Sequence, residues 1–231
     1  AMAPAMLMAP LAALLGALLF GWFTVRLSGV YLAMLTLAFG QIVWSIVFQW
    51  ETFTGGSNGV VGIWPQAPLN NRDFYYGLVL MLTVAGVLGL RMVLFAPFGY
   101  AMRACRDSPL RAEAIGLDVR RVQWIAFTIA GVVGGVAGGL FAFAKGSISP
   151  ETIHVGRSID GIVMVLLGGL QTLSGPVVGG PLFTVLQDTI IRQTEYWRAA
   201  LGLVILAIVL VFPQGVVGSI SDLVRARRRA A

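Results

Sequence analysis

The stretch APFGYAMRACRDSPLRAEAIGLDVRRVQ, residues 96–123, decides how the rest of this chain must be arranged. Apolar runs long enough to cross a bilayer flank it on both sides. Charged side chains are costly inside hydrocarbon, so we expect this stretch to lie outside the membrane. Its charged residues are Arg103, Arg106, Asp107, Arg111, Glu113, Asp118, Arg120 and Arg121.

A short helix is predicted inside this charged stretch, from about Ser108 to Gly116. Ser108 suits the N-cap, Pro109 suits the first helical position, and Gly116 suits the residue after the helix end. A helix of about two turns is not stable alone in water. We therefore expect it to dock on a partner, and that partner is a clue to function.

The composition is that of an all-α integral membrane protein, a polytopic helix bundle. Of 231 residues, 58% are hydrophobic and only 11% are charged, and the mean hydropathy is +0.86. Soluble domains carry about 25% charged residues. One cysteine and one histidine argue against a metal or cofactor site built by this chain alone. The net charge of +6 has a simpler interpretation as loop charge that sets membrane orientation than as a sign of nucleic acid binding.

Six apolar segments can be drawn along the chain, and one of them is broken. The broken one spans 158–191 and contains GGLQTLSGP, residues 168–176. Counted as two crossings, it gives a seven-crossing topology with the N-terminus outside and a basic cytoplasmic tail at 213–231. The other five segments are Ala5–Phe23, Ser28–Trp50, Phe74–Phe95, Val122–Ala144 and Arg198–Phe212.

The distribution of lysine and arginine supports this topology. Of the 16 such residues, five fall outside and 11 inside, in the direction of the positive-inside rule. A cleaved signal peptide over the first segment is an alternative, but its start lacks a basic region. The inside residues are Arg26, Arg91, Arg103, Arg106, Arg111, Arg120, Arg121, Arg225, Arg227, Arg228 and Arg229, and the outside ones are Arg72, Lys145, Arg157, Arg192 and Arg198.

The broken segment has two interpretations. Its first half, Ile159 to Leu170, is too short to span about 30 Å of hydrocarbon. Non-helical backbone at membrane depth is tolerated only inside protein or beside a water-filled cavity, and such breaks mark transport pathways. The alternative is a glycine-rich contact between helices, with a kink. The pathway candidates are Gln41, Gly168, Gly169, Gly175 and Pro176.

Two further features lie in the apolar segments. GVVGGVAGGLFA, residues 131–142, places glycines four residues apart, which predicts close packing against a helix of this chain or of a second membrane subunit. Gln41 is costly in mid-membrane unless it bonds a neighbouring helix or lines the pathway, and both roles remain open.

Five motifs together resemble one family. RACRDSPLRAEAIGLDVRRVQWIAFTIAGVVGGVAGGLFAF, then SISPE, then VMVLLGGLQTLSGPVVGG, with TGGSNGVVGI and GVYLAMLTLAFGQIV upstream, are similar to LivM-type permease subunits of branched-chain amino-acid ABC importers. The resemblance covers about Val25 to Gly218. Urea and short-chain amide permeases share the pattern. Family members carry further N-terminal spans, so we expect a chain truncated relative to the family, with 1–231 forming one transmembrane permease domain.

The resemblance implies a bacterial inner-membrane location and a cytoplasmic coupling loop at 96–122. It implies four kinds of partner: a second, LivH-like permease subunit, two ATP-binding cassette subunits, a periplasmic or lipid-anchored substrate-binding protein, and membrane lipid. It implies no enzymatic activity and no cofactor. The coupling-helix candidates are Ser108, Pro109, Leu110, Arg111, Glu113, Ala114, Ile115 and Gly116.

The residues give an independent reason to expect an external motor, because the chain has no Walker motif with which to hydrolyse ATP. A secondary transporter or channel is the first alternative, but such proteins couple through charge within the membrane, and none is predicted deep in the bilayer here. An integral membrane enzyme is the second, and it would need a cluster of His, Asp or Cys that the sequence lacks.

Overall fold

The computed structural model describes residues 2–64, 71–169, 172–193 and 196–211, together with Gly215 and Gly218. The chain divides into two compact units, residues 1–154 and 155–231, and each is considered by itself. Unit 1 contains α1 (Met2–Thr24), α2 (Val30–Gln49), α3 (Glu51–Thr54), η1 (Gly56–Asn58), β1 (Val60–Val61), α4 (Arg72–Phe95), α5 (Pro97–Asp107), α6 (Pro109–Ala114), α7 (Val119–Lys145), β2 (Ser147–Ile148) and η2 (Pro150–Ile153). Unit 2 contains α8 (Val155–Gly168), α9 (Ser174–Ile191) and α10 (Trp197–Val211).

The fold is that of an all-α polytopic membrane protein, as predicted. Among the described residues, four helices are long and apolar enough to cross a membrane: α1, α2, α4 and α7. The helices of unit 2 are shorter, with 14, 18 and 15 residues in α8, α9 and α10. At 1.5 Å per residue the 14-residue α8 is about 21 Å long, less than the hydrocarbon thickness. Seven crossings therefore remain a prediction, as does the basic tail, most of which lies outside the described residues.

The sequence prediction missed one helix of unit 1, α5. It predicts a single short helix between the third and fourth apolar segments, whereas two helices, α5 and α6, lie there. The fourth span also begins at Val119 rather than Val122. The earlier start has a local cause, because the side chain of Asp118 accepts a hydrogen bond from the Arg121 amide at 3.1 Å and caps the new helix.

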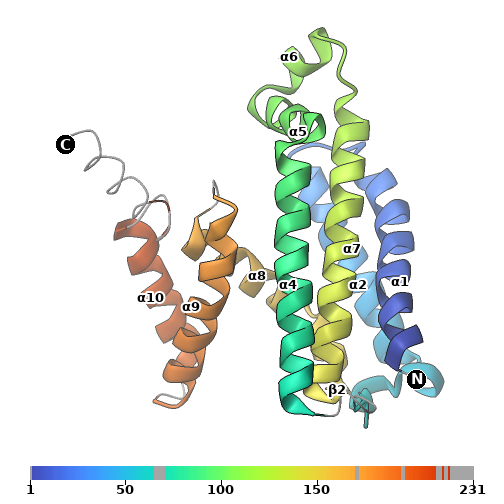
Figure 1. The fold of residues 1–231 in the computed structure, drawn as a ribbon, viewed down its shortest axis with the longest axis vertical. Coiled ribbons are helices and arrows are strands. Elements are labelled where there is room, and N and C mark those ends of the chain that lie inside the picture. Colours follow the sequence, from blue (N-terminus) through green and yellow to red (C-terminus); the bar gives the residue numbers. More distant parts are fainter. Residues whose placement is uncertain are drawn as a thin grey trace. The chain divides into compact units, whose positions relative to one another are not determined.

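Helices α1 and α7 pack antiparallel along small residues (Figure 1). A methyl group added to Gly135 would lie 2.5 Å from the Ala13 methyl, closer than two non-bonded carbon atoms approach. The neighbouring strip of α7 is open, because a methyl group on Gly134 or Gly138 would meet nothing within 4 Å. The predicted close packing therefore occurs within this chain, on one side of the glycine run. The contact aligns Ala9, Ala13 and Ala17 of α1 with Gly139, Gly135 and Gly131 of α7.

Two hydrogen bonds reinforce the bundle of unit 1. The Trp124 indole N–H donates to the Leu18 carbonyl at 3.0 Å, and the Tyr75 hydroxyl of α4 donates to the Leu140 carbonyl of α7 at 2.5 Å. Polar groups at membrane depth need such partners. At one end of these helices the strands β1 and β2 pair antiparallel, and α5 and α6 lie at the opposite end (Figure 1).

In unit 2, α8 and α9 form an antiparallel hairpin, and α10 packs on both helices. We call residues 155–191 the glycine hairpin. Its core is apolar, with Leu167, Phe183 and Leu201 buried together. The break predicted in the apolar segment is confirmed, because α8 ends at Gly168 and α9 begins at Ser174.

Candidate functional site

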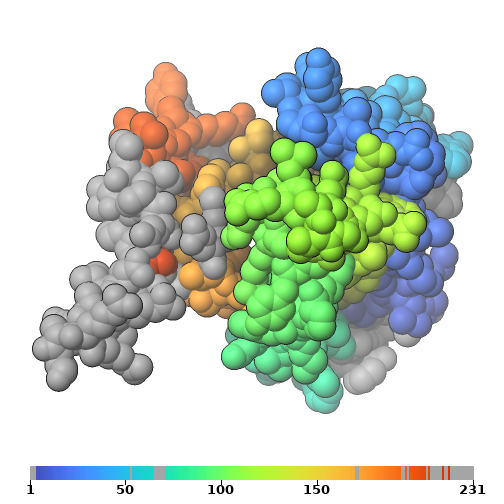
Figure 2. Space-filling model, turned by 90° about the horizontal axis from the view of Figure 1, so that it is seen from above, coloured from blue at the N-terminus to red at the C-terminus, as the bar shows by residue number. Residues whose placement is uncertain are grey.

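The charged stretch folds into a compact helical turn, which we call the elbow (residues 96–119). It begins where α4 ends. Pro97 follows the apolar run and restricts the preceding residue to extended backbone. Ala96 accordingly has φ −75° and ψ 163°, and α5 starts at Pro97 in a new direction. Figure 2 views the molecule from above relative to Figure 1 and shows α5 and α6 as an exposed surface of unit 1.

A small apolar core holds the elbow together. Cys105 of α5, Ala112 of α6 and Val119 of α7 are buried against one another, with 4%, 2% and 7% of their surfaces exposed. Leu117 and Val122 pack against this cluster. Each of the three helices therefore contributes one residue to this core, and the charged side chains of the elbow other than Arg103 are exposed.

The ends of α6 agree with the sequence in part. Gly116 follows the helix with φ +87°, a left-handed conformation that favours glycine. Its amide donates to the Glu113 carbonyl at 2.9 Å, and the Leu117 amide donates to the Ala112 carbonyl at 3.0 Å, which together form a Schellman motif. Ser108 occupies the N-cap position, but its hydroxyl makes no capping hydrogen bond, so this prediction is wrong for the side chain.

The elbow corrects the expectation that a partner protein stabilises the short helix α6. Alone in water α6 would not form, but Ala112 docks it on α5 and α7 of the same chain. A partner protein is therefore not required for the helix to exist. The residues that remain available to a partner are those that the elbow leaves exposed.

Those exposed residues have a distinct chemistry. Leu110 is 80% exposed and Ile115 is 74% exposed, although both are large and apolar. Arg111, Glu113 and Ala114 are also exposed. The ion pairs found among the described residues, Arg106–Asp107, Arg121–Asp118 and Arg157–Asp160, do not involve Arg111 or Glu113. Helix α6 and its C-cap residue Ile115 thus present two apolar side chains together with charges of both signs.

The interruption between α8 and α9, which we call the glycine break, differs in geometry from the elbow. Its candidate residues are Gly168, Gly169, Gly175 and Pro176. Gly168, Gly169 and Gly175 are buried, whereas Pro176 is exposed. A methyl group on Gly168 would overlap the Gly175 carbonyl, and one on Gly175 would overlap the Gly169 carbonyl. Backbone therefore packs on backbone at this turn. Gly169 has φ +118°, a conformation that side chains rarely adopt.

A second backbone contact lies one helical turn further along the hairpin. A methyl group on Gly179 of α9 would overlap the Met164 carbonyl of α8. Gly215 also lies against the turn, because a methyl group added to it would overlap the backbone of Gly169. The glycines thus permit close packing inside unit 2. Their role in a pathway remains a prediction.

Gln41, the remaining pathway candidate, lies in α2 and is exposed within unit 1. The two roles that the sequence allows for it, a bond to another helix or a place in the pathway wall, stay open. Gln41 belongs to unit 1 and the glycine break to unit 2, so each is described within its own unit.

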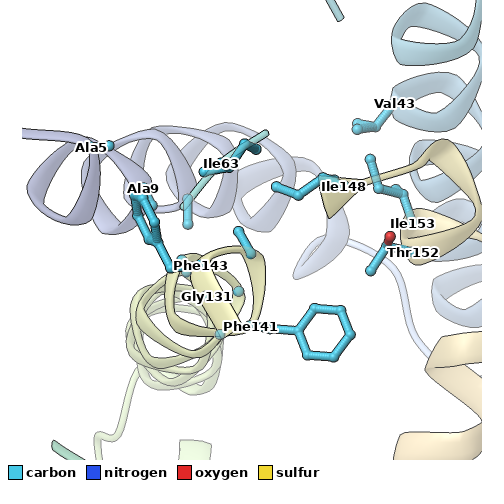
Figure 3. Close-up of a pocket in the computed structure, with 16 residues that line it drawn as sticks. Ala5, Ala9, Val43, Ile63, Gly131, Phe141, Phe143, Ile148, Thr152 and Ile153 are labelled. Carbon is cyan, nitrogen blue, oxygen red and sulfur yellow. The ribbon is translucent and has the colours of Figure 1, made fainter. Parts of the chain in front are cut away.

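An apolar groove of about 760 Å³ lies between α1, α7 and α2. Figure 3 shows Phe141 of α7, Val43 of α2 and Ile148 and Ile153 of the β2–η2 region around it. The floor is formed by small residues such as Gly131. None of its lining residues is charged, so these side chains offer no counter-charge to the ammonium and carboxylate groups of an amino acid.

The sequence analysis missed the parts of the elbow that hold it together. They are helix α5, the buried Cys105 and Ala112, and Arg103, which donates a hydrogen bond to the Leu94 carbonyl. One available signal was Pro97 directly after an apolar run, since proline is common at the first helical position. A second was the alternation of small and charged residues in PFGYAMRACRD, which gives a helix with one polar and one small-residue face. The burial of Cys105 had no local signal.

Comparison with known proteins gives the following matches. The family described as "Branched-chain amino acid transport system / permease component" matches residues 1–212. The high-affinity branched-chain amino acid transport system permease protein LivM of Escherichia coli K12 is 30% identical over 237 residues, which cover 89% of this chain and 56% of that protein. A probable branched-chain amino acid transport permease protein LivH of Methanocaldococcus jannaschii is 29% identical over 64% of this chain and 52% of the relative.

A more distant relative carries a different substrate in its name. The nucleoside ABC transporter permease protein NupC of Lactococcus lactis subsp. cremoris is 26% identical over 61% of this chain and 46% of its own length. The chain thus spans about half the length of the curated relatives it matches. No solved structure matches it.

Proposed function

The chain belongs to the family of permease components of branched-chain amino acid transport systems, and from this premise we propose that it is the transmembrane permease subunit of an ATP-driven importer. The substrate class proposed is branched-chain or related amino acids, in keeping with LivM and LivH among its relatives. In this role the chain forms half of the translocation pathway. It performs no chemistry on the substrate.

The observation that carries this proposal is the elbow. An importer subunit without its own nucleotide site needs a surface on which an ATPase can push. The elbow offers an exposed helix at one end of membrane-spanning helices. The apolar side chains of Leu110 in α6 and of Ile115 at its C-cap have no cover within unit 1. Burying a leucine side chain is worth about 1.5–3 kcal/mol, so this surface gains free energy if a partner covers it.

The proposed partners follow from this role: two ATP-binding cassette subunits on the α6 side, a second, LivH-like permease subunit, and a periplasmic or lipid-anchored substrate-binding protein. With the elbow in the cytoplasm of a bacterium, the chain is a multi-pass protein of the inner membrane. Arg111 and Glu113 sit beside the apolar contact, where an exposed ion pair contributes only about 0–1 kcal/mol. We assign them to the choice of ATPase rather than to affinity.

We also retain the glycine break as part of the pathway proposal. Gly168, Gly169, Gly175 and Pro176 interrupt the helices of unit 2, and such interruptions are found at transport sites. The burial of the three glycines supports a packing role as well, and the two roles are compatible if the outer surface of the turn faces the pathway.

The experiment that tests the coupling role replaces Ala114, an exposed residue of α6, by tryptophan. In a reconstituted importer, Ala114→Trp should leave the membrane subunits assembled while ATP hydrolysis no longer responds to loaded binding protein. Glu113→Gln should reduce the response only slightly. Ala144→Trp, the same change at an exposed residue at the other end of α7, is the matched control. A normal response in Ala114→Trp would remove α6 from the coupling role.

The alternatives make different predictions in the same system. A secondary transporter or channel would move substrate with no ATP-binding subunit present. A permease for urea, short-chain amides or, as for the relative NupC, nucleosides would show ATP-dependent uptake of those compounds and not of leucine. Uptake of radiolabelled leucine, urea and uridine into the same vesicles separates these cases.

A further inference from the structure

The junction between α4 and α5 is held by Arg103, a residue that no part of the proposed function uses. The Arg103 guanidinium donates a hydrogen bond to the Leu94 carbonyl at 2.9 Å. Leu94 lies in the last turn of α4, where carbonyl groups have no partner within the helix. The α5 helix that follows leaves in a new direction at Pro97, so the side chain of Arg103 replaces the missing intrahelical donor.

The charge of Arg103 suits this position. The C-terminal end of a helix carries a partial negative charge, and a cation there contributes about 0.3–1 kcal/mol when exposed and more when partly buried. Arg103 is half-buried. Its guanidinium also lies 5.6 Å from the ring centre of Phe95 and 5.2 Å from that of Tyr100, within the range of cation–π attraction.

Gly99 brings the two helices close enough for this contact. A methyl group on Gly99 would overlap the backbone of Leu94, so the first turn of α5 rests directly on the end of α4. Gly99 and Arg103 are four residues apart and share one face of α5. The buried Cys105 of the same helix contacts α6 and α7 instead. Helix α5 therefore bridges α4 on one side and α6 and α7 on the other.

We propose that Arg103 is a positioning residue that locks α5 onto the C-terminal end of α4, so that a displacement of α6 moves the membrane-spanning helix α4. This inference rests on the proposed coupling function and deepens it. A push on α6 reaches α7 through the turn at Gly116 and Leu117. The direct route from α6 to α4 passes through α5, and the Arg103 contact stiffens that route.

The test uses the full-length permease in its assembled, nanodisc-reconstituted importer, with Cys105 as an internal reporter. Cys105 is the only cysteine of the sequence and is 4% exposed. In Arg103→Gln, helix α5 is released at its α4 end and moves more freely in its packing on α6 and α7, where Cys105 is buried. We therefore expect maleimide to label Cys105 about tenfold faster than in the unmodified protein. Arg106→Gln is the matched control, since Arg106 pairs with the exposed Asp107 next to it, and its labelling rate should not change.

The functional arm uses the same importer in proteoliposomes, which have the closed interior that nanodiscs lack, and measures substrate molecules imported per ATP hydrolysed. Arg103→Gln should lower this ratio about fivefold with the ATPase rate retained, whereas a purely structural role would lower the amount of assembled importer and leave the ratio unchanged. Arg103→Lys keeps the charge but loses the planar fork and the ring contacts, and it should recover part of the ratio. An unchanged ratio in Arg103→Gln overturns the proposal, whether or not Cys105 becomes reactive, and so does a reduced ratio with Cys105 still protected.

The two arms separate this inference from the proposed function. If the unmodified protein shows no ATP-linked uptake, the importer proposal fails and the transmission role of Arg103 is overturned with it. The labelling of Cys105, which needs no transport, still reports whether Arg103 holds the α4–α5 junction.

Discussion

The elbow and the glycine hairpin were both singled out from the sequence, but their marked residues are used in opposite ways. In the elbow the residues of α6 are mostly exposed, and a small core of Cys105, Ala112 and Val119 supports them from beneath. In the hairpin the marked glycines are themselves the packed residues. Substitutions of exposed residues in α6 therefore report contacts with a partner. Substitutions of the packed glycines in the hairpin first change the stability of unit 2, so a loss of transport in such variants has two possible causes.

This comparison changes how the pathway hypothesis can be tested. The variant Gly169→Val cannot test the pathway, because Gly169 has φ +118° and a β-branched residue there strains the backbone whatever the role of the site. Loss of uptake in that variant would not separate pathway from packing. Neighbouring residues that differ only in burial give a sharper test.

The largest effect is expected from Gly179→Ala in the hairpin. The added methyl group would overlap the Met164 carbonyl, and overpacking of this kind costs about 3 kcal/mol. Gly180→Ala is the matched control, because nothing lies within 4 Å of its added methyl group. Thermal unfolding in detergent, followed by size-exclusion chromatography, should show Gly179→Ala unfolding well below Gly180→Ala. Equal stability of the two variants would contradict the backbone contact between α8 and α9.

A smaller effect is expected from Gly135→Ala in α7. Its added methyl group would lie 2.5 Å from the Ala13 methyl, so α1 must shift and about 1–2 kcal/mol of stability is lost. Gly134→Ala meets open space and gains helix propensity of about 0.5–1 kcal/mol. The same unfolding assay should therefore move the two variants in opposite directions. A gain in both would mean that α1 does not pack on this face of α7.

Leu110→Ser should weaken partner binding without changing the fold. Leu110 is 80% exposed, so the stability of the isolated permease should change by no more than about 0.5 kcal/mol. If an ATP-binding subunit covers Leu110, its affinity should fall about tenfold, which corresponds to about 1.4 kcal/mol. Titration of the purified ATPase onto permease in nanodiscs measures this. Unchanged affinity would mean that the exposed apolar pair is not the docking surface.

The variant with the smallest expected effect on the protein tests the membrane orientation of the elbow. Labelling of Cys105 itself cannot report the side of the membrane, because the thiol is buried. In the variant Cys105→Ala with Arg106→Cys, the new thiol replaces an exposed side chain. Loss of the buried Cys105 sulfur should cost only about 1 kcal/mol of stability. A membrane-impermeant maleimide should label it only after cells are permeabilised. Labelling of intact cells would place the elbow outside and reverse the topology.

Much of this fold was predictable because its signals are local. Long apolar runs indicated the four spans that are confirmed as membrane-length helices. Clustered Gly and Pro indicated the break between α8 and α9, and Gly116 indicated the end of α6, where only a residue tolerant of positive φ fits easily. Each signal depends on a few neighbouring residues, so each can be read from the sequence alone.

Tertiary structure decided which of these residues are covered. In a membrane-spanning helix nearly every side is apolar, so periodicity does not tell the packed face from the lipid-facing one. Only the position of α1 makes Gly135 a contact and leaves Gly134 open. In the same way, Ala112 and Ala114 are chemically identical, and the approach of Cys105 and Val119 buries the first and leaves the second exposed. The sequence determined where the helices are, and packing between residues far apart in the chain determined which of their surfaces remain free to act.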